Sequence, residues 1–160
     1  MIVIDASALV KLLLREEGWE EVAEHVRAGA VSVDLVAKEA VNAVWRALRR
    51  GLVTREAADS MLEALRVLLG RAVKLENEMA YLEPAIGIAF TRGVTVYDAL
   101  YIALAKARGL SLLTADREQA GVAEAEGVST LLLNGIPLSS DEVGKKLRAS
   151  WGQGEVRRES

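Results

Sequence analysis

The chain has 160 residues and a mass of 17.3 kDa, and 51% of its residues are hydrophobic, which is enough for one sizeable core but not for two ordinary domains. A net charge of −3 and an aromatic content of 4% argue against a nucleic-acid coat protein and against a base-stacking module. The absence of cysteine excludes disulfides, thiolate zinc sites and a cysteine nucleophile, and fits a reducing compartment. Since no apolar run approaches the ~20 residues of a membrane span, we expect a cytoplasmic protein without a membrane partner.

The first half of the chain alternates short apolar runs with amphipathic stretches. Gly18 separates two helical stretches, and Asp34 and Thr54 are good helix N-caps that each precede apolar residues at helical spacing. The expected elements are strands at 2–4 and 31–33 and helices at 6–14, 19–28, 35–50 and 55–70.

The second half continues this alternation. Pro84 predicts a bend or restart within one helix, and Asp98 is expected to open a strongly apolar helix that Gly109 closes. The expected elements are strands at 72–75, 112–113 and 128–133 and helices at 78–90, at 98–108 and after 116. This order predicts an α/β fold, a single-domain parallel β-sheet flanked by helices over residues 1–150, followed by a frayed tail at 151–160.

Four acidic side chains lie where a strand-like run gives way to a helix, or one turn inside a helix: Asp5, Glu39, Asp98 and Asp116. In open parallel sheets, ligands collect beyond the carboxyl ends of the strands, because the following turns and helix starts converge there. This placement would bring four distant carboxylates to one edge of the sheet.

Each of these acids also has an ordinary structural explanation. Asp is a favoured helix N-cap, so Asp5, Asp98 and Asp116 could each cap the helix that follows. Glu39 lies inside a helix, where a lone Glu is most often a surface charge. Only the joint pattern favours a functional site.

Four converging carboxylates need a compensating positive charge, because two of them ~4 Å apart repel by about 4 kcal/mol at an effective dielectric of ~20. Lys38 and Arg117 adjoin acids in the sequence, but helix neighbours point ~100° apart, so neither side chain reaches the same site easily. A bound ion is the more economical answer. With oxygen ligands only, Mg²⁺ or Mn²⁺ is favoured over zinc.

Three neutral side chains could support this site. Asn42 lies three positions after Glu39 and is expected on the same helical face, where it could orient the carboxylate or a metal-bound water. Ser7 and Thr114 each lie two positions from an acid and could bond a carboxylate or a substrate phosphate. Ordinary turn or cap bonding explains each hydroxyl equally well.

Read together, these segments resemble the PIN domain, in particular the VapC-like toxins of toxin-antitoxin pairs. The resemblance covers roughly residues 1–133, and the stretch around Asp98 is its most specific part. The matching segments are Val3-Ile4-Asp5-Ala6-Ser7, then Glu39 with Asn42, then Tyr97-Asp98-Ala99-Leu100-Tyr101-Ile102-Ala103-Leu104-Ala105, then Leu113-Thr114-Ala115-Asp116-Arg117.

The resemblance implies a Mg²⁺- or Mn²⁺-dependent endoribonuclease, a homodimer and a partner antitoxin that covers the site. It places the catalytic and metal-binding acids at Asp5, Glu39, Asp98 and Asp116, with Asp116 the least uniform in its role. The inferred reaction is hydrolysis of an RNA phosphodiester by a metal-activated water, which leaves a 5′-phosphate.

Two other classes of protein remain open. A phosphoacceptor signalling domain also gathers acids and a Thr at the end of a parallel sheet, but it needs paired acids near the first strand, and Asp5 has no acidic neighbour. A PIN-like scaffold could bind RNA or protein without cutting, although all four acids are present.

Further side chains have plainer interpretations. Tyr101 is expected to be a packing residue with its hydroxyl bonded. Trp45 could be a core residue or a dimer contact, and the family resemblance favours the dimer contact. Arg46 belongs to an arginine cluster that is best explained as a solvated helix end, and His25 to a helix surface.

Overall fold

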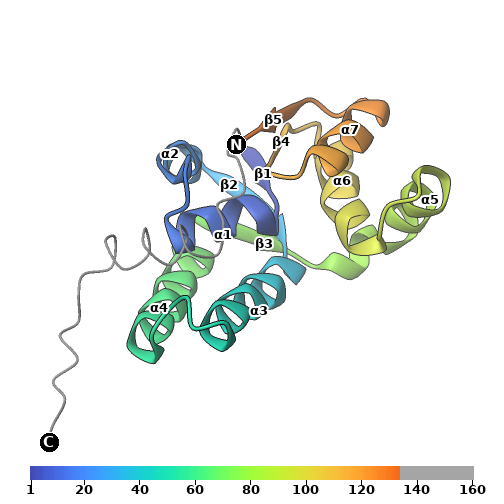
Figure 1. The fold of residues 1–160 in the computed structure, drawn as a ribbon. Helices are drawn as coiled ribbons and strands as arrows, with labels where there is room; N and C mark the ends of the chain where they lie inside the picture. Colours follow the sequence, from blue (N-terminus) through green and yellow to red (C-terminus); the bar gives the residue numbers. More distant parts are fainter. Residues whose placement is uncertain (134–160) are drawn as a thin grey trace, which may run out of the picture.

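The computed structural model describes residues 1–133, so the predicted domain end at 150 and the predicted tail at 151–160 lie outside the described residues. Five parallel strands form one sheet in the order β3-β2-β1-β4-β5 (Figure 1). This sheet confirms the predicted α/β fold. The strands are β1 (Ile2–Ile4), β2 (Ala30–Val33), β3 (Val73–Glu76), β4 (Leu112–Thr114) and β5 (Thr130–Leu132).

Helices connect the strands and cover both faces of the sheet. Figure 1 shows α1 to α4 gathered on one side of the strands and α5 to α7 on the other. The helices are α1 (Ala6–Leu14), α2 (Trp19–Ala28), α3 (Leu35–Arg49), α4 (Arg55–Arg71), the 3₁₀ turn η1 (Glu78–Tyr81), α5 (Leu82–Arg92), α6 (Val96–Arg108) and α7 (Arg117–Ala125).

The three central strands consist almost entirely of apolar residues because helices bury them from both sides. Every residue of β1, β2 and β4 is buried, and these strands are the centre of one large core. Helix α6 is buried without interruption over residues 99–105, and it packs against β1, β2 and β4. This burial on all sides explains why the sequence of α6 is apolar without interruption over this stretch.

The strand order fixes where the acids meet. β1 pairs with β2 on one side and with β4 on the other, with Val3 opposite Leu112 and Ile4 opposite Leu113. Parallel strands present their carboxyl ends at one edge, where the helices after β1, β2 and β4 begin. Helix α6 precedes β4 and so runs back along the sheet, which puts its first turn at the same edge.

Two helix starts differ from the sequence-based expectation. Helix α6 begins at Val96, and Thr95, rather than Asp98, is its N-cap: the Thr95 hydroxyl accepts the Asp98 backbone N–H at 3.2 Å. The Asp98 side chain is therefore not the N-cap of α6. Asp34 occupies the N-cap position of α3 without a side-chain cap bond, and its Oδ1 instead accepts the backbone N–H of Glu78 at 2.9 Å.

No single helix within residues 1–133 is long and apolar enough to span a membrane. Among the described helices, only the pair formed by 78–92 and 96–108 passes that test together, and it is bent by 118°.

Candidate active site

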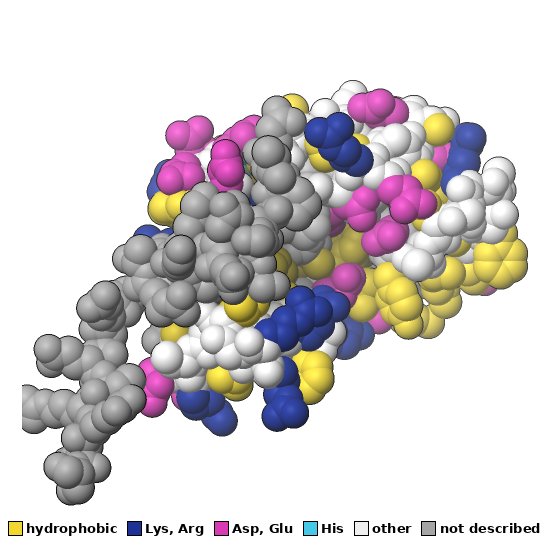
Figure 2. Space-filling model, viewed as in Figure 1, with side chains coloured by type: hydrophobic (Ala, Val, Ile, Leu, Met, Phe, Trp, Pro, Cys, Tyr) yellow, Lys and Arg dark blue, Asp and Glu magenta, His cyan; other side chains and the backbone are white. Residues whose placement is uncertain are grey.

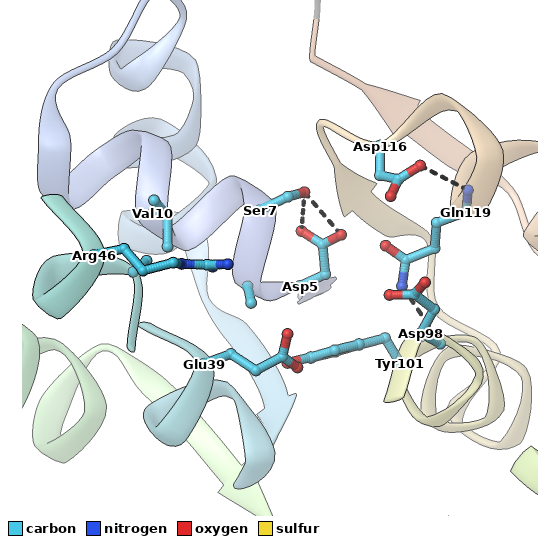
Figure 3. A pocket seen from close by; sticks show the side chains of 11 residues that line it. Asp5, Ser7, Val10, Glu39, Arg46, Asp98, Tyr101, Asp116 and Gln119 are labelled. Atoms are coloured by element: carbon cyan, nitrogen blue, oxygen red, sulfur yellow. Dashed lines mark hydrogen bonds between the residues drawn. The ribbon is translucent and has the colours of Figure 1, made fainter. Parts of the chain in front are cut away.

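The four predicted acids line one pocket at the carboxyl edge of the sheet (Figure 3). Its volume is about 260 Å³, and its walls come from the start of α1, the middle of α3, the first turn of α6 and the start of α7. The lining residues are Asp5, Ala6, Ser7, Val10, Glu39, Ala43, Arg46, Asp98, Tyr101, Asp116 and Gln119. The joint pattern of acids in the sequence therefore corresponds to a physical juxtaposition.

Asp5 lies at the bottom of this pocket, directly after β1, and is 2% exposed. Its Oδ1 accepts the Ala8 backbone N–H at 2.8 Å, so Asp5 does cap α1, as the plainer explanation required. The Ser7 hydroxyl lies 2.7 Å from Oδ1 and 2.9 Å from Oδ2, and the Thr114 hydroxyl donates to Oδ2. Asp5 is thus both the N-cap of α1 and a residue of the pocket.

Ser7 and Thr114 also hold the end of β4 in place. The Ser7 Oγ accepts the backbone N–H of Ala115 at 2.9 Å, and the Thr114 Oγ1 accepts that of Asp116 at 3.0 Å. Each hydroxyl therefore accepts from the β4–α7 turn and donates toward Asp5. Through these bonds the two side chains link Asp5, at the end of β1, to the β4–α7 turn.

Burial dominates the electrostatics of Asp5. Loss of solvation raises the pKa of its carboxyl from 3.8 to about 6, although the bonds from Thr114, Ala8 and Ser7 each act to lower it. Asp116 adds a smaller upward effect through charge repulsion. A buried carboxyl kept this far from its ordinary pKa, inside a pocket, is typical of functional sites.

Glu39 enters the pocket from α3 and is held by Tyr101 of α6. The Tyr101 hydroxyl donates to the Glu39 Oε1 at 2.8 Å, and Tyr101 itself is only 1% exposed, so its predicted packing role and its bonded hydroxyl are both observed. Burial raises the pKa of Glu39, as does the charge of Asp98, while the Tyr101 bond lowers it. Burial first, and then the Glu39 charge, raise the pKa of Tyr101.

Asp98 and Asp116 form the opposite wall, and Gln119 connects them. The backbone N–H of Gln119 donates to Asp116 Oδ1 at 3.1 Å, and its Nε2 donates to the Asp98 carbonyl at 3.1 Å. Burial, followed by the Thr95 interaction and the charge of Asp116, governs the pKa of Asp98, which is raised overall. Gln119 was missed in the sequence, although its place three positions after the Asp116 N-cap is that of a capping box.

Arg46 is the second residue that sequence reasoning missed. The pocket-facing stripe of α3 is Glu39, Ala43 and Arg46, which follows the i, i+4, i+7 spacing of a helix face. Arg46 is thus a pocket residue as well as part of an exposed arginine cluster. Its positive charge lowers the pKa of Glu39.

Asn42 does not belong to this stripe. Three positions along a helix leave two side chains about 60° apart, and here that rotation places Asn42 with Val41 and Trp45 along a separate depression on the outer side of α3. The expectation that Asn42 shares the face of Glu39 is therefore wrong within the described residues. The supporting role of Asn42 stays a prediction, because Asn42 does not line the pocket of Glu39.

The family model described as the PIN domain matches residues 2–125. The chain belongs to the PIN-domain family. Among curated relatives, this PIN domain is 40% identical over 121 residues to "Ribonuclease VapC3" of Pyrobaculum aerophilum, covering 74% of this chain and 92% of that protein. It is 35% identical over 115 residues to "Exonuclease VapC9" of the same organism, covering 72% of this chain and 80% of that protein.

Solved structures agree on the fold of this PIN domain. PAE2754 of Pyrobaculum aerophilum matches with a TM-score of 0.63 and 29% identity, covering 92% of this chain and 96% of that one. FitAcB of Neisseria gonorrhoeae matches with a TM-score of 0.56 and 20% identity, covering 82% and 96% respectively, and supports the fold alone.

The donor set of the pocket fits a hard divalent ion. Its polar lining is rich in carboxylate oxygens, and burial raises the pKa of Asp5, Glu39 and Asp98, a cost that a cation among them would offset. Within residues 1–133, no three acidic or histidine side chains are already close enough to ligate one ion together. Mg²⁺ commonly binds through one or two carboxylates and keeps several waters, so this looser arrangement suits it.

Proposed function

We propose that this PIN domain is a divalent-metal-dependent endoribonuclease and the toxin of a toxin-antitoxin pair. The observation that carries the proposal is the convergence of Asp5, Glu39, Asp98 and Asp116 on one pocket. Proteins named "Ribonuclease VapC3" and "Exonuclease VapC9" share 40% and 35% of their aligned residues with the chain, and this similarity supports nuclease activity. Mg²⁺ or Mn²⁺ is the proposed ion, because oxygen atoms are the available ligands.

Each acid has a distinct place in this proposal. Asp5, Glu39 and Asp98 would hold the ion, and Asp116 would add charge from the wall opposite α3. At such a site a divalent ion supplies a water of lowered pKa and offsets charge on the phosphoryl oxygens. Tyr101 fixes the orientation of Glu39, and Ser7 and Thr114 fix that of Asp5, so the protein's contribution is a preorganised set of carboxylates.

The partners in this proposal are single-stranded RNA, an antitoxin and a second copy of the chain, in the cytoplasm. An apolar surface outside the pocket supports the homodimer: Phe90 is 83% exposed, Met79 63% and Tyr97 62%. Figure 2 shows hydrophobic side chains gathered over the region of η1 and α5. Large exposed apolar patches on soluble proteins mark interaction surfaces.

The decisive experiment is cleavage of a closed circular RNA, which has no ends for an exonuclease to attack. The protein should linearise it with Mg²⁺ or Mn²⁺, stop when a chelator is added, and leave 5′-phosphates. Asp98→Asn should lower the rate at least about 100-fold, as loss of a central electrostatic group does. Asp59→Asn, at an exposed acid on α4, is the matched control and should stay active.

Three outcomes would contradict the proposal. Equal cleavage by wild type and Asp98→Asn would point to a contaminating nuclease or a different site. Degradation of linear RNA but not of circular RNA would replace the endonuclease with an exonuclease. Tight RNA binding without cleavage by the wild type would favour a scaffold.

A further inference from the structure

Arg46 is the cation of the acidic pocket, and its position is fixed by helix geometry. It lies two helical turns after Glu39 on α3, and its side chain runs past Val10 into the pocket (Figure 3). Figure 3 shows its guanidinium between α1 and α3, on the side of the pocket across from Asp98 and Asp116. The α3 wall therefore carries a positive charge beside the Glu39 carboxylate, whereas the wall formed by Asp98 and Asp116 carries negative charge only.

The Arg46 guanidinium has no protein partner among residues 1–133. No salt bridge or side-chain hydrogen bond joins it to any described residue, and its effect on Glu39 acts through space. Other arginines of the same fold are paired: Arg55 with Asp59 at 3.1 Å, and Arg108 with Glu76 at 3.0 Å. The five N–H donors of the Arg46 guanidinium thus make no hydrogen bond to a side chain within residues 1–133.

A phosphate is the ligand that such a group recognises best. The planar fork of an arginine matches two phosphate oxygens at once, and such charge-assisted pairs are the stronger class of hydrogen bond. RNA also brings one negative charge per nucleotide toward four carboxylates, so a strand needs a cation at the point where it enters. Only one positive side chain lines the pocket within the described residues, and it is Arg46.

We propose that Arg46 binds a phosphate of the RNA strand on the α3 side of the pocket, next to the phosphate that is cleaved. This inference rests on the proposed function and names the substrate-binding residue of the same site. Arg46 acts on the ground state and the transition state alike, because its phosphate is not the reacting one. Its loss should consequently raise KM and leave kcat nearly unchanged at alkaline pH, where Glu39 is ionised with or without Arg46.

A purely structural role for Arg46 predicts a different result. If Arg46 served only to lower the pKa of Glu39, its removal would change kcat and the acidic limb of the pH–rate profile, with KM constant. If it served only as part of a diffuse basic cluster, removal of a neighbouring arginine would have the same effect. The experiment therefore needs both a kinetic separation and a neighbouring control.

The test compares Arg46→Ala, Arg46→Lys and Arg49→Ala, the last an exposed arginine one turn further along α3. KM for a short single-stranded RNA should rise about tenfold or more in Arg46→Ala, in line with loss of a charged hydrogen bond. Arg46→Lys should recover part of the affinity, because it keeps the charge and loses the fork. Arg49→Ala should change KM by less than about twofold.

Binding without cleavage provides the second readout. Each substitution is placed in Asp98→Asn, and the affinity for the same fluorescent RNA is measured by anisotropy across a salt series. The slope of log K against log salt should fall by about 0.7 with Arg46→Ala, the value of one phosphate contact on a single strand. Equal slopes for Arg46→Ala and Arg49→Ala would overturn the proposal, as would a loss confined to kcat.

The two proposals fail in different ways. A wild type that cleaves RNA while Arg46→Ala keeps its KM and its salt slope leaves the nuclease intact and refutes the role of Arg46. A wild type that neither cleaves nor binds RNA refutes both.

Discussion

Tyr101 donates its hydroxyl hydrogen to Glu39 across 62 positions of sequence, and this bond joins the α6 and α3 sides of the candidate active site. Helix α6 lies in the core and is buried over 99–105, whereas α3 packs mainly against the helices α1 and α4. A rigid phenol anchored in the core thus sets the orientation of a carboxylate on a more peripheral helix. Tyr101 acts through Glu39, so it is a positioning residue.

Removal of this hydroxyl should affect activity at low pH more than at high pH. The Tyr101 bond lowers the pKa of Glu39, so Tyr101→Phe should raise that pKa further and leave more of Glu39 protonated. We expect the acidic limb of the pH–rate profile to move to higher pH, with a stability loss of about 1 kcal/mol. Rates measured from pH 5.5 to 9 check this.

Tyr97→Phe is the matched control, because Tyr97 is 62% exposed near the start of the same helix. Its profile should coincide with that of the wild type. Parallel loss of rate at every pH in Tyr101→Phe would show that the hydroxyl does not tune Glu39.

Asp5 should make the metal-free protein less stable as the pH rises. Its pKa is raised to about 6 in the folded state, against 3.8 for an ordinary Asp, so the folded protein binds the extra proton between those values. The stability that this carboxyl contributes is complete below pH ~4 and is lost as the pH passes ~6. Two pKa units correspond to about 3 kcal/mol, an order-of-magnitude figure.

Asp5→Asn should therefore be more stable than the wild type at pH 7.5 in chelator, and the difference should shrink at pH 4.5. Urea unfolding at both pH values measures it, with Asp59→Asn, an exposed acid, as the control. Mg²⁺ or Mn²⁺ at pH 7.5 should raise the Tm of the wild type more than that of Asp5→Asn, because a bound ion stabilises only the folded state that holds it. A wild type stabilised by rising pH in chelator would contradict this account.

The apolar surface over η1 and α5 should hold two copies together. Phe90 is the most exposed member of this surface, and Phe90→Ser removes its exposed ring while leaving the buried core untouched. We expect light scattering after gel filtration to give twice the chain mass for the wild type and one chain mass for Phe90→Ser. Val67→Ser, at an exposed apolar position on α4, should stay dimeric, and a wild type that elutes as a monomer at high micromolar concentration would refute the dimer.

Much of the fold could be predicted from sequence because local signals and burial agree. The strand at 2–4 and the helices at 6–14 and 19–28 have the expected bounds, since a β-branched run, Gly18 and Gly29 mark their ends. Thr95 was overlooked as a cap although it precedes Asp98 by three positions, which is the spacing of a capping bond.

The candidate site was predictable only in part, because sequence gives the edge of the sheet but not the rotation of each helix. Asp5, Asp98 and Asp116 follow from strand ends and helix starts. Asn42 and Arg46 depend on how α3 is turned about its own axis, which packing against α1 and α4 decides. Spacing alone allowed either of them to accompany Glu39.

The central place of β1 means that the pocket is completed late. Asp5 leads the chain, but its Thr114 partner lies 109 residues further along and arrives with β4. At about 5 to 20 residues per second, a ribosome needs roughly 5 to 20 seconds to synthesise that interval. During this time the growing chain carries Asp5, then Glu39 and later Asp98, without the β4 edge that joins them, so the carboxylate pocket forms only after β4 has been synthesised.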